Sequence, residues 1–128
     1  MATVVKVAEL TTSADKVWEI VSDVGNVPAL TGMVEESRMD GTTRLCTLAG
    51  GGELRETILS VDSEARRLAY RIHESPFPIE EHAASIVVEA LDEGCRVTWT
   101  TDLLPDSAVP AFREAADAMF ADMTRRLG

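Results

Sequence analysis

Several common structural and catalytic signatures are missing from this sequence. No apolar run approaches the ~20 residues that a membrane-spanning helix needs, and the first residues lack the basic segment and apolar core of a secretory signal. There is no dinucleotide fingerprint and no serine-histidine-aspartate order of a nucleophilic triad. The run Gly50-Gly51-Gly52 is not a phosphate loop, because no lysine follows it. We therefore expect a cytoplasmic protein without the motifs of the common nucleotide-dependent or hydrolytic enzymes.

Basic residues are also scarce. The chain has 12 Lys and Arg against 22 Asp and Glu, which gives a net charge of −10. Such a surface repels the phosphate backbone of nucleic acids and the headgroups of anionic lipids. Neither nucleic acid binding nor membrane insertion is expected.

Cysteine is limited to Cys46 and Cys95, which lie in separate predicted strands. They form no CxxC pair, and no histidine lies close to them in the sequence, so two free thiols are expected rather than a disulfide. The triplet Glu80-Glu81-His82 is a weak metal candidate, because strand alternation directs Glu81 away from His82. We expect no metal and no cofactor.

The chain is long enough for one hydrophobic core. It has 128 residues, of which 45% are hydrophobic, and it contains no repeat, linker or low-complexity stretch. Residues 1–128 are therefore expected to form a single domain.

The pattern of elements predicts an α+β fold. A β-branched strand at 3–10 precedes a helix at 14–22, and Pro28 opens a second short helical turn. From Val34 the period changes to two, which predicts antiparallel strands at 34–39, 44–48, 53–62, 68–74, 82–91 and 95–104.

A long helix is predicted at the end of the chain, capped by Pro105-Asp106-Ser107 and beginning near Val109. Its apolar stripe has members three or four residues apart: Val109, Phe112, Ala116, Met119, Phe120, Met123 and Leu127. Only this helix is long enough to cover a face of the seven-stranded sheet, and a curved sheet around one helix leaves room for a cavity.

Two polar residues fall in phase with apolar neighbours. Glu56 shares a strand face with Leu54 and Ile58, and His82 shares one with Ala84, Ile86 and Val88. Aiming a carboxylate and an imidazole at an apolar interior is costly unless they have partners or a function. This pattern predicts a semi-polar internal pocket.

Each of these residues has functional interpretations and a structural one. Glu56 is a general acid or base, or an acceptor for a ligand hydroxyl, or else it pairs with Arg44 across the sheet. His82 relays protons or orients a ligand carbonyl, or else it is a satisfied histidine at a strand end. His73 is out of phase with Tyr70 and is expected in solvent.

Large apolar side chains are candidates for the pocket lining, although plain core is the commoner fate of such side chains. The candidates are Tyr70, Trp99, Phe112, Met119, Phe120 and Met123. The two methionines suit a loosely specific pocket, because methionine adapts to irregular guests. Phe77, in the rigid loop Ser75-Pro76-Phe77-Pro78, is a lid side chain or a hydrophobic plug.

An ordered series of short stretches runs along the chain. It comprises Ser13-Ala14-Asp15-Lys16-Val17-Trp18-Glu19-Ile20-Val21-Ser22-Asp23 with Pro28 and Gly41-x-x-Arg44, then Glu53-Leu54-Arg55-Glu56 with Asp62, then Tyr70-Arg71-Ile72 and His82-Ala83-Ala84-Ser85. In this order they resemble the START/Bet v 1-like (SRPBCC) superfamily. The resemblance is to its polyketide cyclase/dehydrase-like members, nearest to bacterial relatives of plant abscisic-acid receptors.

The resemblance implies a helix-grip fold with a deep cavity for lipids, hormones or polyketides. It implies that Glu56 and His82 face this cavity, and that Gly50-Gly51-Gly52 and the Ser75–Ile79 loop with Pro76 and Phe77 act as gate and latch. The receptor gate sequence is missing, and Val34-Glu35-Glu36 stands where a basic residue would meet the ligand's carboxylate. An abscisic-acid-like acid and hormone signalling are therefore not implied.

Three functions remain open from the sequence. The protein binds a small hydrophobic molecule through Glu56, His82 and the apolar lining. Alternatively it is a polyketide cyclase/dehydratase-like enzyme that uses Glu56 and His82 for acid/base chemistry. In the third case, ligand-driven closure of the two loops creates a surface for a protein partner. A monomer and a homodimer are equally compatible with the sequence.

Overall fold

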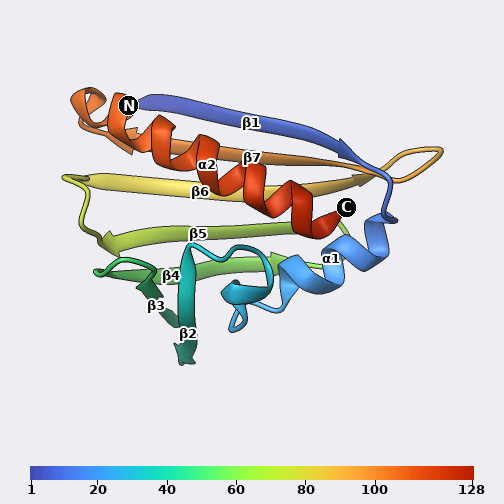
Figure 1. Ribbon diagram of the computed structural model, residues 1–128, viewed down its shortest axis with the longest axis horizontal. Coiled ribbons are helices and arrows are strands. Elements are labelled where there is room, and N and C mark those ends of the chain that lie inside the picture. Colours follow the sequence, from blue (N-terminus) through green and yellow to red (C-terminus); the bar gives the residue numbers. More distant parts are fainter.

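A strongly curved antiparallel sheet surrounds one long helix in the computed structural model, which describes residues 1–128 (Figure 1). The sheet order is β1-β7-β6-β5-β4-β3-β2, so β1 and β2 are its edges. Its strands are β1 (Ala2–Leu10), β2 (Val34–Asp40), β3 (Thr43–Leu48), β4 (Glu53–Asp62), β5 (Arg67–Glu74), β6 (Glu81–Ala90) and β7 (Cys95–Leu104). The predicted α+β helix-grip architecture is confirmed.

The concave face of the sheet holds the core, because alternate residues of each strand point inward. In β7, for example, the side chains from Cys95 to Leu103 are buried at every second position. The same alternation in β6 buries His82, Ala84, Ile86 and Val88. The strand parity read from the sequence therefore places His82 correctly.

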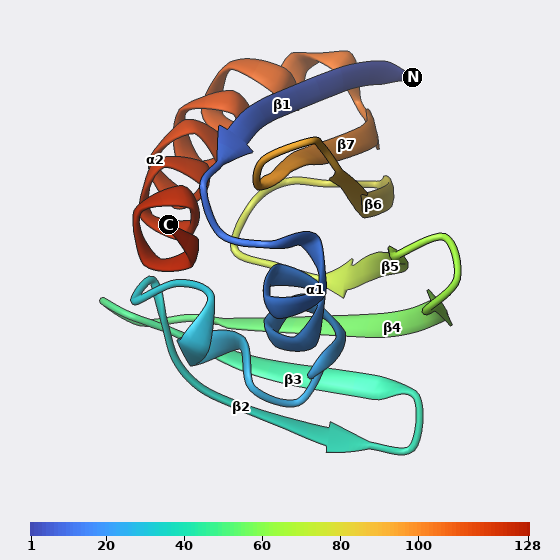
Figure 2. The same ribbon diagram turned by 90° about the vertical axis from the view of Figure 1, so that its right-hand side faces the viewer.

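Two short helical segments join β1 to β2, as predicted. Helix α1 (Ala14–Ser22) begins at Ser13, whose hydroxyl accepts the backbone N–H of Lys16 at 3.3 Å. The 3₁₀ turn η1 (Val27–Ala29) contains Pro28. α1 lies at the open end of the curved sheet (Figure 2) and buries Val17 and Val21 there.

Helix α2 (Val109–Leu127) crosses the concave face and brings its apolar stripe onto the sheet (Figure 1). The predicted side-chain cap at Pro105-Asp106-Ser107 is wrong. These residues lead into a 3₁₀ turn, η2 (Asp106–Ala108), and no side chain caps α2. Pro110 in the first turn has no N–H to satisfy, which reduces the need for a cap.

None of the helices is both long and apolar enough to cross a membrane.

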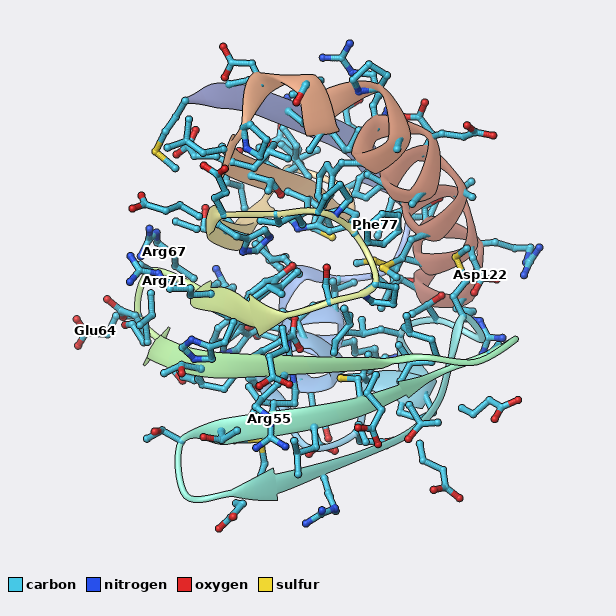
Figure 3. The ribbon with its side chains drawn as sticks, turned by 90° about the vertical axis from the view of Figure 1, so that its left-hand side faces the viewer. Arg55, Glu64, Arg67, Arg71, Phe77 and Asp122 are labelled. Carbon is cyan, nitrogen blue, oxygen red and sulfur yellow. The ribbon has the colours of Figure 1, made fainter.

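Polar contacts fix the position of α2. Asp122 accepts hydrogen bonds from the Thr31 hydroxyl at 2.9 Å and from the Gly32 N–H at 2.8 Å, which ties the helix to the segment after η1 (Figure 3). At the other sheet edge, Lys6 of β1 forms an ion pair with Asp117. The helix is therefore held from both sides of the concave face.

The sheet is irregular in the middle. Arg55 pairs with Glu74 and Glu56 pairs with Ile72, so His73 is an extra, unpaired residue in β5. Pairing of β5 with β6 extends only as far as Tyr70 and Ala84. Beyond that point the two strands separate, and His82 lies at the separation.

Candidate functional site

Two small cavities lie between the sheet and α2. Their volumes are about 70 and 50 Å³, and we call them the His82 lobe and the Arg44 lobe. Both are lined mainly by hydrophobic residues. They share five lining residues: Leu54, Glu56, Tyr70, Trp99 and Met119. They are therefore two neighbouring parts of one apolar interior, separated by a few side chains.

Glu56 faces this interior and is ion-paired. Its Oε1 accepts the Nε–H of Arg44 at 2.7 Å, and the Sγ of Cys46 lies 3.5 Å from the same oxygen. Arg44 is 5% and Glu56 4% exposed. Antiparallel pairing of β3 with β4 places Arg44 opposite Glu56. The interpretation of Glu56 as a partner of Arg44 is confirmed, while its Oε2 has no hydrogen-bond partner in the structure.

The ion pair sets the electrostatics of its surroundings. Burial lowers the pKa of Arg44, but the charge and hydrogen bond of Glu56 outweigh it, so the net shift is upward. Burial, together with the Glu56 carboxylate, raises the pKa of the Cys46 thiol to about 12. Cys46 is therefore an inert thiol at neutral pH.

His82 bridges the gap between β5 and β6. Its Nδ1 accepts the backbone N–H of Ile72 at 3.1 Å, and its carbonyl accepts the Nε–H of Arg71 at 3.2 Å. The ring packs between Tyr70 and Phe112, with centroid distances of 5.8 and 6.2 Å. Burial, and the charge of Arg71, lower the pKa of His82 to about 4, so the imidazole is neutral at neutral pH.

Tyr70 and Trp99 are joined at the centre of the interior. The Trp99 Nε1–H donates to the Tyr70 hydroxyl at 3.0 Å, and both residues line both lobes. Arg44 also lies over the Tyr70 ring, 5.2 Å from its centroid. Burial is the largest cause that raises the pKa of Tyr70, so its hydroxyl keeps its proton.

The aromatic and methionine side chains of α2 divide among several places. Phe112 lines the His82 lobe, Met123 lines the Arg44 lobe and Met119 lines both. Phe120 lines neither lobe. Its ring stacks on Trp99 with centroids 6.2 Å apart, so it packs against a lining residue instead of lining a lobe itself.

The two loops predicted as gate and latch approach each other. Gly52 has φ +99°, and a Cβ there would lie 2.8 Å from the Cγ of Pro76. Gly50 and Gly51 also have positive φ but no neighbour within 4 Å of such a Cβ. The β3–β4 and β5–β6 loops therefore meet at Gly52 and Pro76.

Phe77 lies between the His82 lobe and the outside. It projects from the β5–β6 loop toward α2 (Figure 3) and lines the lobe. It also lines an open surface depression of about 420 Å³ together with Ala111, Glu114, Ala115 and Ala118 of α2. Phe77 and Ala115 thus separate the interior from solvent.

Several lining residues are not among those predicted from the sequence. Leu54 and Ile72 from the sheet, Leu30 after η1, and Ala115 of α2 border the lobes. Parity along β3 could have added Cys46, because it shares a face with Arg44. No parity argument could have found Ala115, because its position depends on how α2 rotates against the Phe77 loop.

A larger depression of about 370 Å³ lies outside the core, between η1 and the strands β2 to β4. Its lining is polar except for Pro28 and Leu45 and includes Glu36, Arg38 and Arg55. A hydrophobic molecule would gain little burial there. No cluster of three or more histidine, cysteine or carboxylate residues could hold a metal ion.

A curved sheet that grips one helix over an apolar interior defines the START/Bet v 1-like class. Residues 1–128 match the family described as polyketide cyclase/dehydrase and lipid transport, and the chain belongs to this family. No curated protein matches the sequence at a significant level.

Solved structures confirm the fold. An uncharacterized protein from Bacillus thuringiensis has a TM-score of 0.86 and 19% identity, over 98% of this chain and 96% of that one. A protein from Thermobifida fusca has a TM-score of 0.84 and 28% identity, over 99% and 91% of the two chains. Norcoclaurine synthase from Thalictrum flavum, in complex with dopamine and hydroxybenzaldehyde, has a TM-score of 0.75 and 21% identity, over 98% and 85%.

Proposed function

We propose that the protein binds a small hydrophobic molecule between the sheet and α2. The observation that carries this proposal is the pair of adjoining lobes, whose linings are 11 of 14 and 9 of 11 hydrophobic. The few polar groups in these linings, among them Glu56 and His82, would orient a guest. Membership of a family that includes lipid-transport proteins supports the proposal. The same fold in norcoclaurine synthase accommodates two small aromatic molecules.

Binding requires the interior to widen. Lobes of about 70 and 50 Å³ are well below the roughly 300–1,000 Å³ of typical ligand pockets. Met119 lies in both lobes, and its flexible side chain can shift to join them. Movement of Phe77 would then open the joined cavity toward the surface depression on α2.

The first experiment is native mass spectrometry of the protein purified from its own host, followed by denaturation and identification of any released molecule. A stoichiometric apolar molecule supports the proposal. Absence of a bound molecule, together with a melting temperature that no member of a lipid and polyketide panel changes, contradicts it.

A matched pair of variants tests where binding occurs. Ala115→Leu fills the boundary between the His82 lobe and the surface, whereas Ala121→Leu adds the same atoms at an exposed position of α2 that lines neither lobe. Ala115→Leu is expected to abolish the thermal shift produced by a binding panel member. Ala121→Leu is expected to preserve it.

The second candidate function is acid/base catalysis, as in a polyketide cyclase or dehydratase. The observation that favours it is the free Oε2 of Glu56 in the lining that both lobes share. His82 would act in such a reaction as a donor, because its Nδ1 is occupied. Glu56→Gln, assayed at a temperature at which the variant is still folded, would then remove turnover while the folded variant keeps its affinity for the substrate.

A further inference from the structure

His82 carries a buried hydrogen-bond donor that the protein leaves unused. The residue is 1% exposed, and its Nε2 has no hydrogen-bond partner. Because Nδ1 accepts the Ile72 N–H, the neutral ring must carry its proton on Nε2. The sheet contact thus fixes the tautomer and makes Nε2–H a donor.

No acceptor lies within hydrogen-bond distance of this donor. The ring lies between Tyr70 and Phe112, and aromatic faces are weak acceptors. A buried donor without an acceptor is unfavourable, and natural proteins contain few of them. Nδ1 of His82 has a structural role, because it accepts the Ile72 N–H in the gap between β5 and β6. Nε2 has no such role.

A second donor lines the same lobe. The Tyr70 hydroxyl accepts the Trp99 Nε1–H, and its own proton has no acceptor in the structure. Tyr70 and His82 both line the His82 lobe, with ring centroids 5.8 Å apart. One ligand oxygen with two lone pairs could accept from both donors.

The charges of the interior favour an uncharged guest. The Arg44 guanidinium is neutralised by Glu56, and His82 is neutral, so the lobes present no free positive charge. Moving a carboxylate from water into this interior would be costly without a cation to pair with it. A carbonyl oxygen accepts hydrogen bonds without carrying a charge.

We propose that the cavity selects uncharged hydrophobic molecules that carry a carbonyl oxygen, which accepts from His82 Nε2–H and Tyr70 O–H. This inference rests on the proposed binding function and names the chemical class of its ligand. The carbonyl end occupies the His82 lobe, and the apolar body extends past Met119 into the Arg44 lobe. His82 is therefore the residue that distinguishes a ketone or aldehyde from a hydrocarbon of the same shape.

Acetophenone and α-methylstyrene test the donor, because they differ only by C=O against C=CH₂. Dissociation constants for both are measured by NMR titration of the intact protein, with the ¹⁵N and proton signals of His82 Nε2–H as a direct readout. Saturating acetophenone is expected to shift the Nε2–H proton downfield, as a new hydrogen bond does, and α-methylstyrene is expected to cause no downfield shift. Benzoate is expected to bind at least about tenfold more weakly than acetophenone, because its carboxylate has no cationic partner.

Two variants separate the roles of the two ring nitrogens. His82→Asn keeps an acceptor for the Ile72 N–H but removes the donor at the position of Nε2. It is expected to weaken the binding of acetophenone by about tenfold and to change the dissociation constant of α-methylstyrene by less than about twofold. His82→Gln places an amide N–H near the Nε2 position and should restore part of the preference for acetophenone over α-methylstyrene. Met119→Leu, a purely apolar change in the same lining, should change the dissociation constants of both probes by the same factor.

The outcomes distinguish this inference from the proposed function. If His82→Asn weakens the binding of both probes equally, the cavity binds hydrophobic molecules but the carbonyl inference is wrong. The same holds if acetophenone binds without a downfield shift of the Nε2–H proton. If neither probe binds saturably up to its solubility limit, both the inference and the binding function are contradicted.

Discussion

The imidazole of His82 accepts the backbone N–H of Ile72 at the place where the pairing of β5 with β6 ends. The side chain thus supplies an acceptor where a regular ladder would offer a backbone carbonyl. Protonation of Nδ1 would replace this acceptor with a second donor and would place a charge in the core. The stability of the sheet therefore depends on the charge state of His82.

Stability is expected to fall as the pH drops from about 6.5 to about 4. Below pH 6.5 the unfolded chain protonates at His82, while the folded chain resists protonation until about pH 4. Above this window the ring is neutral in both states and adds no pH dependence. Urea denaturation should show a loss of about 2 kcal/mol between about pH 7 and pH 5 that is absent in His82→Asn.

Other charged groups surround the ring and are present in both proteins, so the comparison isolates His82. On the outer side, a surface depression contains Arg71, His73, Glu80 and Glu81, and on the cavity side Glu56 lies in the same lobe. An equal loss in wild type and His82→Asn would assign the pH dependence to these groups instead.

Removal of one partner of the Arg44–Glu56 pair is expected to be strongly destabilising. Glu56→Gln keeps the shape of the side chain but leaves the Arg44 charge buried and unpaired, which costs about 3–5 kcal/mol. The exposed pair of Arg55 with Glu74 provides the control, because Glu74→Gln should cost less than about 1 kcal/mol. The difference in urea midpoint between the two variants measures the effect of burial, and similar midpoints would contradict this prediction.

Strand parity and the order of elements could be read from the sequence because both depend on local periodicity. Parity placed Glu56 and His82 inside and His73 in solvent, and the structure confirms each placement. The ion pair of Glu56 with Arg44 was one of two interpretations, because periodicity fixes which face a residue occupies but not which strands pair. Pairing of β3 with β4 decides between them.

Features that depend on packing between distant elements could not be predicted. The volume of the lobes depends on how closely α2 approaches the sheet, and the polar contacts of Asp122 that help to set this distance lie outside the hydrophobic pattern. The stacking of Phe120 on Trp99 rather than against a lobe depends on the rotation of α2. The contact of His82 Nδ1 with the Ile72 N–H depends on where the pairing of β5 with β6 ends, which no sequence signal marked.

A methyl group at Gly52 is expected to destabilise the contact between the two loops. Gly52→Ala has to adopt φ +99° and also meets Pro76, whereas Gly51→Ala has to adopt φ +106° with no neighbour within 4 Å. Backbone strain alone costs about 1–3 kcal/mol in either variant. The extra loss in Gly52→Ala, measured by thermal or urea unfolding, reports the contact with Pro76. Pro76→Ala in the same chain should recover that extra loss, and if it does not, the contact has no energetic role.

Truncation of Phe77 is expected to speed the exchange of ligands more than it changes their affinity. The side chain separates the His82 lobe from the surface depression on α2, so Phe77→Ala removes the largest obstacle on this route. With the neutral probe N-phenyl-1-naphthylamine in stopped-flow fluorescence, association and dissociation rates should both rise, on the order of tenfold. Pro78→Ala, an exposed change in the same loop, should leave both rates unchanged. Equal rates in Phe77→Ala and wild type would show that molecules reach the interior by another route, and the opening between β5 and β6 beside His82 would then be the next place to test.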